Sequence, residues 1–273
     1  MKANKLTILK SILQKLSSAI IAFSGGVDSS FLCAVAKEVL KDKVLAVTAV
    51  SETYPQSELK DAKSMARLLK IRHKIIKTNE FNDKRFISNP PQRCYFCKKE
   101  LFEQLKAVAK KEVIKTILDA SNYDDLKDFR PGTKAKKELG VKSPLQEAKM
   151  TKADIRKFSK KMGLPTWDKP ACACLASRVP YGENISTEKL RKIEDAETFI
   201  GSIIPKTNIR VRAHNNIARI EIDPSKIPGI LKGDIMKKIA RKLKDLGFSY
   251  VTLDLEGFRS GSMNEGIKKW MKK

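Results

Sequence analysis

Two hydrophobic patterns alternate along the first half of the chain. Short apolar runs with little alternation, typical of strands covered on both faces of a parallel sheet, stand at residues 19–23, 44–50, 72–76 and 116–120. Between them, apolar residues recur at helical spacing, over residues 5–16, 29–40, 57–69 and 95–111. The alternation predicts an α/β fold, a doubly wound and mostly parallel sheet with its ligand site at the carboxyl ends of the strands.

The pattern changes twice in the second half. Residues 121–183 contain long loops around two helical segments, at 133–139 and 151–162, and loops of this length in a compact domain are usually functional. The following residues instead predict a small α+β unit, with helices at 187–200 and 233–246 and strands at 208–213, 218–222 and 250–255. We therefore expect two domains, residues 1–183 and residues 184–273.

Composition narrows the class of protein. A chain of 273 residues that is 41% hydrophobic can bury the core of a two-domain globular protein. No apolar run is long enough to cross a bilayer, and residues 1–5 lack the apolar core of a signal peptide. We expect a soluble, cytoplasmic protein without a membrane partner.

The chain is strongly basic, with 56 Lys and Arg against 31 Asp and Glu and a net charge of +25. This charge would suit a nucleic-acid binder, and it would equally attract nucleotides and other phosphorylated small molecules. Lysines scattered over solvated helix faces, or a hot or salty habitat, produce the same excess. The charge by itself therefore does not establish RNA binding.

Five cysteines in a cytosolic chain argue against a disulfide framework. Cys33 falls in the apolar stripe of a predicted helix, where we expect it to pack in the core. The other four form two close pairs, Cys94 with Cys97 and Cys172 with Cys174. The sequence contains only two histidines, so we do not expect a His-based catalytic triad.

The clearest candidate for chemistry is the stretch Ser24-Gly25-Gly26-Val27-Asp28-Ser29, which links the first predicted strand to the next helix. Its glycines let the backbone approach a ligand, and the amides of the first helical turn point at that ligand with the helix dipole behind them. The lysine of a Walker loop is absent, so this is an anion site of another kind. The stretch resembles the pyrophosphate loop of the PP-loop ATP pyrophosphatases.

Further segments resemble one branch of that superfamily, the LarE sulfur transferases of nickel-pincer cofactor synthesis. The likeness covers nearly the whole chain and is carried by NPPQRCYFCK (89–98), DASNYDD (119–125), FRPG (129–132), SPL (143–145), GLPTWDKP (163–170), SRVPYG (177–182), IRVR (209–212) and LDLEGFRSG (253–261). The resemblance implies that ATP adenylates a carboxylate of a pyridinium dicarboxylate mononucleotide and releases pyrophosphate. A sulfur nucleophile then displaces AMP and leaves a thiocarboxylate, because adenylation gives the carboxylate a good leaving group.

The resemblance also assigns the cysteines. Some members of the family sacrifice one cysteine as the sulfur source, whereas others hold a [4Fe-4S] cluster on three cysteines and carry an extra sulfide on its open iron. Cys94, Cys97 and Cys174 match the three-cysteine type, which implies an iron–sulfur cofactor supplied by inorganic sulfide or another sulfur donor. Cys172 departs from the family pattern, and it is a fourth ligand, a persulfide carrier or a bystander.

The residues themselves leave the cysteine chemistry open. Cys94 and Cys97 are three apart at the start of a predicted helix, so their sulfurs share a face. The helix N-terminus and the neighbours Arg93, Lys98 and Lys99 favour thiolates. A four-cysteine zinc site and a set of reduced thiols are the alternatives to the cluster.

Further roles follow from the resemblance. Ser24, Gly25, Gly26, Val27, Asp28 and Ser29 would hold the pyrophosphate of ATP, with Asp28 placing Mg²⁺, and Ser51 would lie near the adenine or ribose. Lys98 and Arg130 would neutralise the α-phosphate in catalysis. Ser177, Arg178, Arg210 and Arg212 would bind the substrate phosphate, at a subunit interface of a trimer-based homo-oligomer. For the charged residues, an ordinary place on a solvated surface or at a helix terminus is the alternative.

Two other functions compete with sulfur transfer to a small molecule. A PP-loop tRNA thiolation enzyme would share the loop and the adenylation step and would fit the net charge, but no RNA-binding module or aromatic–basic interleaving is recognisable. A sulfur carrier that binds nucleotide and metal without catalysis is the second alternative. An ammonia-using synthetase of the same superfamily would have no use for the cysteines.

Overall fold

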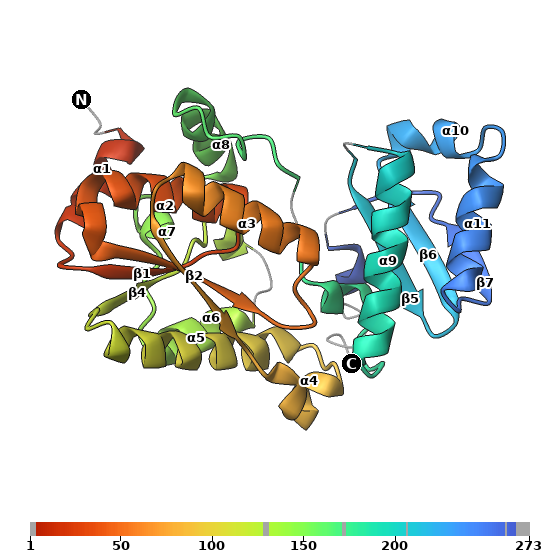
Figure 1. Cartoon of the computed structure of the whole chain (residues 1–273), viewed down its shortest axis with the longest axis horizontal. Helices are drawn as coiled ribbons and strands as arrows, with labels where there is room; N and C mark the ends of the chain where they lie inside the picture. Colours follow the sequence, from red (N-terminus) through yellow and green to blue (C-terminus); the bar gives the residue numbers. More distant parts are fainter. Residues whose placement is uncertain (1–3, 128–130, 171–172, 206, 260, 266–273) are drawn as a thin grey trace. The chain divides into compact units, whose positions relative to one another are not determined.

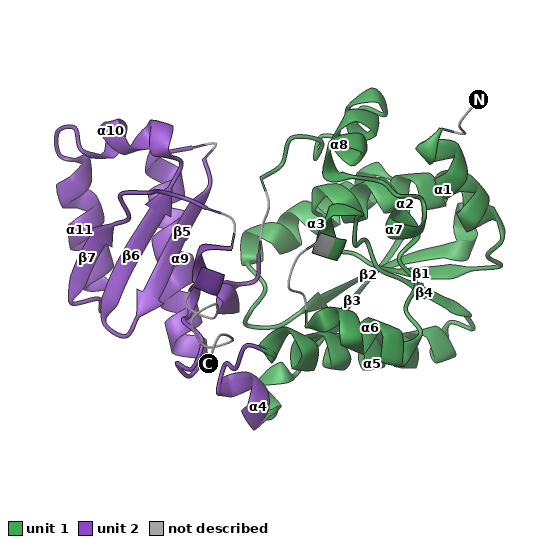
Figure 2. Ribbon diagram, turned by 180° about the vertical axis from the view of Figure 1, so that it is seen from behind, with its two compact units in different colours: residues 1–83, 92–171 green, residues 84–91, 172–273 purple. Residues whose placement is uncertain are grey.

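The structure is a computed structural model, and it describes residues 4–127, 131–170, 173–205, 207–259 and 261–265. The chain divides into two compact units (Figure 2). Unit 1 comprises residues 1–83 and 92–171, and unit 2 comprises residues 84–91 and 172–273. In the described part of the chain, no helix is both long and apolar enough to span a bilayer.

Unit 1 is built on a parallel four-stranded sheet in the order β3-β2-β1-β4. Ile20 lies opposite Leu45 on one side and Ile117 on the other, so the central strand is paired along both edges. The strands are β1 (Ala19–Ala22), β2 (Val44–Val50), β3 (Arg72–Lys77) and β4 (Thr116–Leu118). The four predicted strands are confirmed to within about two residues at each end, as expected for fraying element boundaries.

Helices cover both faces of this sheet (Figure 1). Successive residues of a strand point to opposite faces, so Ile20 and Ile21 enter two different cores. One core is covered by α1 (Lys5–Gln14), α2 (Val27–Leu40), α3 (Gln56–Leu68), α7 (Pro144–Glu147) and α8 (Lys152–Lys161). The other core is covered by α5 (Arg93–Lys111) and α6 (Gly132–Leu139). The predicted doubly wound architecture is confirmed.

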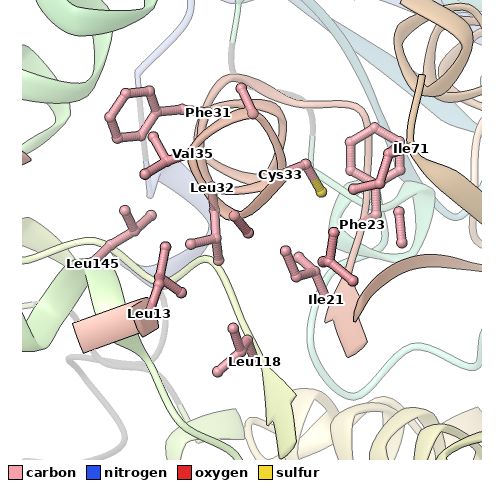
Figure 3. Packing of buried hydrophobic residues seen from close by; sticks show 14 of the residues in the cluster. Leu13, Ile21, Phe23, Phe31, Leu32, Cys33, Val35, Ile71, Leu118 and Leu145 are labelled. Carbon is pink, nitrogen blue, oxygen red and sulfur yellow. The ribbon is translucent and has the colours of Figure 1, made fainter. Parts of the chain in front are cut away.

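The first core is centred on α2. Leu32 and Val35 of this helix point toward Leu13 and Leu145, while Cys33 faces Phe23 on the other side (Figure 3). Cys33 is completely buried, and burial raises the pKa of its thiol. Its predicted place in the core is confirmed, and it is too deeply packed to act as a ligand or nucleophile.

Unit 2 contains a mixed three-stranded sheet in the order β5-β6-β7. The strands are β5 (Ile209–His214), β6 (Ile217–Ile222) and β7 (Tyr250–Leu253), with β6 antiparallel to β5 and parallel to β7. The helices are α4 (Lys84–Ile87), α9 (Thr187–Ile203), α10 (Ile227–Ile230) and α11 (Ile235–Asp245). The predicted smaller α+β region is confirmed.

Residues 84–91 join unit 2 through Asn89. Its side-chain amide donates to the carbonyls of Val179 and Pro180, at 3.2 and 2.7 Å. Its own carbonyl accepts from the amide of Gly182 at 2.9 Å. Asn89 is fully buried, so residues 84–91 become part of unit 2, although they stand far from its other residues in the sequence.

Candidate functional site

The strand order fixes where a ligand can bind in unit 1. The chain runs from β1 outward to β2 and β3, then crosses to the opposite side of β1 to form β4. In an open α/β sheet, ligands bind outside the carboxyl ends of the strands at such a reversal. The segments that leave β1 and β4 there are residues 23–26 and 119–123. They include the pyrophosphate loop expected from the sequence.

Gly25 is the residue on which the shape of this loop depends. Its φ is +68°, in the left-handed region that side chains other than glycine rarely adopt. A Cβ atom there would also lie 2.8 Å from the Cα of Ala62 on α3, which is closer than carbon atoms can approach. The loop can therefore pass against α3 only with glycine at this position.

The hydroxyl groups of Ser24 and Ser29 connect the two ends of the loop. Ser29 donates to the carbonyl of Gly26 at 3.3 Å, and the hydroxyls of Ser24 and Ser29 lie 3.1 Å apart. The amide of Gly26 donates to the Ser24 hydroxyl at 3.4 Å. Among the described residues no side chain caps α2, so the first-turn amides are available to an anion. This is the arrangement that the sequence predicted for a phosphate site.

Asp28 lies in the first turn of α2 and is met by two residues from distant segments. Its Oδ2 lies 2.7 Å from the ammonium of Lys152 on α8, and the Asn122 side-chain amide approaches the same oxygen at 3.5 Å. Its Oδ1 is buried and has no hydrogen-bond partner in the described part of the chain. A carboxylate oxygen left without a donor fits a ligand position for Mg²⁺, which binds through carboxylates and phosphates.

A buried polar cluster supports the loop after β4. The ammonium of Lys136 lies 3.1 Å from Asp119, and it donates to the hydroxyls of Ser121 and Ser143 at 2.9 and 3.0 Å. Both hydroxyls donate to the Asp119 carboxylate, each at 2.5 Å. Every charge is paired, so the cluster fixes the loop that carries Asn122. From the sequence we expected Lys136 on a solvated helix face; this expectation is wrong, because the structure buries Lys136 against Asp119 directly after β4.

Ser51 follows β2, where the sequence analysis expected a contact with adenine or ribose. In the structure its hydroxyl donates to Oε1 of Glu80 at 2.6 Å, and the Thr53 hydroxyl donates to the same oxygen at 3.0 Å. Glu80 is buried, and its Oε2 has no hydrogen-bond partner among the described residues. Sequence reasoning missed Glu80 because no local motif marks it. The expected nucleotide contact of Ser51 stays a prediction.

The first cysteine pair stands at the start of α5. A helix that leads into a parallel strand begins at the carboxyl edge of the sheet, so Cys94 and Cys97 lie at the same edge as the pyrophosphate loop. Both are half-buried. Gly132 of α6 packs closely beside them, since a Cβ there would lie 2.8 Å from Lys98 Cγ and 3.3 Å from the Cys94 carbonyl. The backbone of Gly132 therefore lies close against the first turn of α5.

Lys98 and Arg130 are the residues expected to neutralise the α-phosphate, and the structure describes only the first of them. Lys98 lies on α5 with its ammonium 5.6 Å from the ring centre of Phe102, one turn further along the same helix. Arg130 lies outside the described residues. Their roles stay predictions.

In unit 2, Cys174 is held by Arg178. Nη1 of Arg178 donates to the carbonyls of Ala173 and Cys174, at 2.5 and 2.9 Å. Nε and Nη2 donate to the two carboxylate oxygens of Glu197 on α9, at 2.9 and 2.8 Å. The Arg178 side chain is only 1% exposed. Glu197 was not recognised in the sequence, where nothing distinguishes it from the other acidic residues of its helix.

Arg210 and Arg212 point to one face of β5, because residues two apart on a strand lie on the same face. Arg212 donates to Glu221 at 2.7 Å and to the carbonyl of Ser177 at 3.1 Å. Arg210 lies over the ring of Phe258, 5.2 Å from its centre. Nε of Arg212 is buried and has no partner in the described part of the chain. The structure therefore brings three of the expected phosphate ligands, Ser177, Arg178 and Arg212, into one connected network.

The expected cluster ligands are divided between the units. Cys94 and Cys97 belong to unit 1, Cys174 belongs to unit 2, and Cys172 lies outside the described residues. Within neither unit do the described residues gather three His, Cys, Asp or Glu side chains around a common point. Thiolate donors fit iron–sulfur and zinc chemistry alike, so the [4Fe-4S] cluster stays a prediction.

Comparison with known proteins identifies relatives along the whole chain. Residues 3–86 match the NAD synthase family. An uncharacterized protein of Synechocystis sp. is 41% identical over 269 residues, which cover 98% of this chain and 100% of the relative. An uncharacterized protein of Methanocaldococcus jannaschii is 36% identical over 261 residues, or 94% of this chain and 98% of the relative.

One relative has a named activity. A pyridinium-3,5-bisthiocarboxylic acid mononucleotide synthase of Lactiplantibacillus plantarum is 37% identical over 268 residues, which cover 98% of this chain and 96% of the synthase. The match to the NAD synthase family lies on the pyrophosphate loop and its flanking elements. The chain belongs to the LarE family of PP-loop enzymes, the ATP-dependent sulfurtransferases.

Proposed function

We propose that this enzyme converts carboxylates of pyridinium-3,5-biscarboxylic acid mononucleotide into thiocarboxylates for nickel-pincer cofactor synthesis. The observation that carries the proposal is the full-length similarity to a synthase of the bisthiocarboxylic product. The geometry of unit 1 supports it, because an uncapped helix and a carboxylate with an unpartnered oxygen stand together at the ligand-binding edge of the sheet. ATP would bind there with Mg²⁺ on Asp28.

The first step is adenylation. An oxygen of the substrate carboxylate attacks the α-phosphorus of ATP, the bond to the bridging oxygen breaks, and pyrophosphate leaves with that oxygen. Ser24 to Ser29 hold the departing pyrophosphate on backbone amides and hydroxyls. Lys98 and Arg130 neutralise charge on the α-phosphate, and Ser51 lies near the adenine or ribose.

The second step is sulfur transfer. A sulfide attacks the acyl carbon, AMP leaves with its phosphate oxygen, and the sulfide proton goes to solvent. Repeating both steps at the second carboxylate gives the dithiolated product at the expense of two ATP. Cys94, Cys97 and Cys174 would hold a [4Fe-4S] cluster, which supplies an open iron for the sulfide.

The substrate phosphate would bind to unit 2. Arg210 and Arg212 share a strand face, and a buried guanidinium can bind phosphate with two parallel hydrogen bonds. Ser177 and Arg178 belong to the same network, although Arg178 also holds the backbone at Cys174. We expect a trimer-based homo-oligomer in which this site lies at a subunit interface, and light scattering measures that state.

One experiment tests the whole proposal. The protein is purified without oxygen, its iron, zinc and labile sulfide are measured, and ATP is added with the pyridinium dicarboxylate mononucleotide. We expect about four irons per chain, as three thiolates and a cubane require, together with pyrophosphate release that depends on the substrate and a thiocarboxylate product. Zinc without labile sulfide would contradict the cluster, and pyrophosphate release on tRNA in place of the mononucleotide would contradict the substrate.

A further inference from the structure

We propose that Lys152 is a phosphate-binding residue of the ATP site, held by Asp28 until the nucleotide arrives. This inference rests on the proposed function, because it concerns the same site. Residues 24–29 contain no Lys or Arg, although the phosphates of ATP carry several negative charges. A cation that neutralises them must therefore come from another segment of the chain.

Lys152 is a cation that the fold brings to the loop from a distant segment. It is the first residue of α8, and its ammonium lies 2.7 Å from Oδ2 of Asp28, which stands 124 residues earlier in the sequence. Asp28 belongs to the helical turn whose amides are available to an anion. The Lys152 side chain is 33% exposed, so a ligand can reach it from solvent.

The backbone of Lys152 is held in place, whereas its side-chain ammonium can move. Its amide donates to the carboxylate of Asp124 at 2.8 Å, and the amide of Asp124 donates to the Asn122 side chain at 2.9 Å. Thr151 and Asp154 cap the same helical turn reciprocally. The four-carbon stem beyond this anchor is flexible, so the ammonium can swing between Asp28 and a neighbouring anion.

The Asp28 carboxylate can bind a metal ion in place of Lys152. With Oδ1 buried and unpartnered, its carboxylate can accept a divalent cation as well as Lys152. When Asp28 takes up Mg²⁺ with the nucleotide, the double positive charge repels the ammonium at close range. Lys152 would then turn to the phosphate oxygens of the nucleotide, where it would offset charge that develops as pyrophosphate leaves.

The competing interpretation is that Lys152 only anchors Asp28. In that case Lys152 would influence nucleotide binding solely through the Asp28 carboxylate, by neutralising and orienting it, and the effect would vanish in a protein that carries Asp28→Asn. A direct phosphate contact would act with or without that carboxylate. Binding of a non-reacting nucleotide to proteins with and without Asp28→Asn therefore separates the two roles.

The test compares Lys152→Met with Lys157→Met, which removes the same charge from an exposed position on the same helix. Each substitution is made alone and together with Asp28→Asn, and binding of α,β-methylene-ATP is measured by calorimetry. We expect Lys152→Met to weaken binding about 10- to 100-fold in both backgrounds, as for loss of a charge-assisted hydrogen bond. We expect Lys157→Met to bind as the wild type does.

Equal binding with and without Lys152→Met in the Asp28→Asn background would overturn the inference. If Lys152→Met fails to fold by circular dichroism, Lys152→Gln, which can still donate to Asp28, is used in its place under the same criterion. Failure of the proposed function has a different signature, in which wild type binds the analogue but the pyridinium substrate causes no pyrophosphate release from ATP. The Lys152 contact would then stand while the substrate assignment fell.

Discussion

Arg178 joins Glu197 to the backbone of Cys174. One edge of the guanidinium donates to both carboxylate oxygens of Glu197, and Nη1 donates to the carbonyls of Ala173 and Cys174. Glu197 also accepts from the amide of Val211 on β5 at 2.9 Å. The helix α9, the strand β5 and the cysteine segment are thus tied through one carboxylate.

Removing that carboxylate should destabilise unit 2. Glu197→Ala leaves the buried Arg178 charge unpaired, and we expect a loss of about 3–5 kcal/mol in the free energy of unfolding. Urea unfolding followed by circular dichroism measures it. Glu188→Ala on the same helix removes a carboxylate that is 76% exposed and pairs with Lys192 one turn further along, so we expect little change in stability. Equal losses in the two variants would contradict the structural role of Glu197.

Gly25 offers a test of the loop geometry. Gly25→Ala adds both left-handed strain and a clash with the Ala62 backbone, whereas Gly163→Ala adds the strain alone, because φ is again +68° and no atom lies within 4 Å of the added carbon. We expect Gly163→Ala to cost about 1–2 kcal/mol of stability. Gly25→Ala should cost more and should also abolish binding of α,β-methylene-ATP. Measurable nucleotide binding by Gly25→Ala would place the phosphates elsewhere.

Cys174→Ser separates the two proposed steps. Under the proposed function, adenylation would take place at the loop of unit 1, so pyrophosphate release should persist in this variant. Thiocarboxylate formation should stop, because the proposed sulfur site has lost one of its cysteines. Both products are measured in one anaerobic assay. Cys33→Ala removes a thiol buried in the core of unit 1 and should leave sulfur transfer intact. Sulfur transfer by Cys174→Ser at the wild-type rate would exclude a role for this cysteine.

The lowered pKa of His73 leads us to expect that the stability of unit 1 depends on pH. Burial lowers the pKa of His73, and the charge of Lys63 lowers it further. The Thr48 hydroxyl donates to the Phe23 carbonyl, so it accepts from Nε2 of His73, and the pair fixes the strand end before the pyrophosphate loop. The unfolded chain therefore binds a proton at His73 more readily than the folded protein does. The contribution of neutral His73 to stability is complete above the pKa that His73 has in the unfolded chain. It is lost as the pH falls through the lower pKa of the folded protein.

Urea unfolding at pH 7.5 and 5.5 measures this dependence. We expect wild type to lose stability at the lower pH, and His73→Gln to lose less. Burial also lowers the pKa of His214 in unit 2, so a residual dependence should remain in the variant. An unchanged dependence in His73→Gln would assign the whole effect to other groups.

The sequence determined the elements and the loop. Apolar runs and helical spacing identified all four strands of the parallel sheet and the three of the smaller one, because burial on one or two faces imposes a period that can be read locally. Helical spacing likewise predicted α8, at residues 151–162, and the structure shows that a capping box of Thr151 and Asp154 begins it. The short helices α4, α7 and α10 were missed, since a single turn has too few residues to show a period.

Tertiary structure decided which charges meet. Lys152 pairs with Asp28 because α8 packs beside α2. Lys136 on α6 pairs with Asp119, which directly follows β4. Glu197 pairs with Arg178 because α9 lies against the segment that carries Cys174. A lysine or glutamate on an amphipathic helix has no local signature of its partner. The sequence therefore supplied the chemistry of the loop and the cysteines, whereas the packing of distant helices chose the residues that orient them.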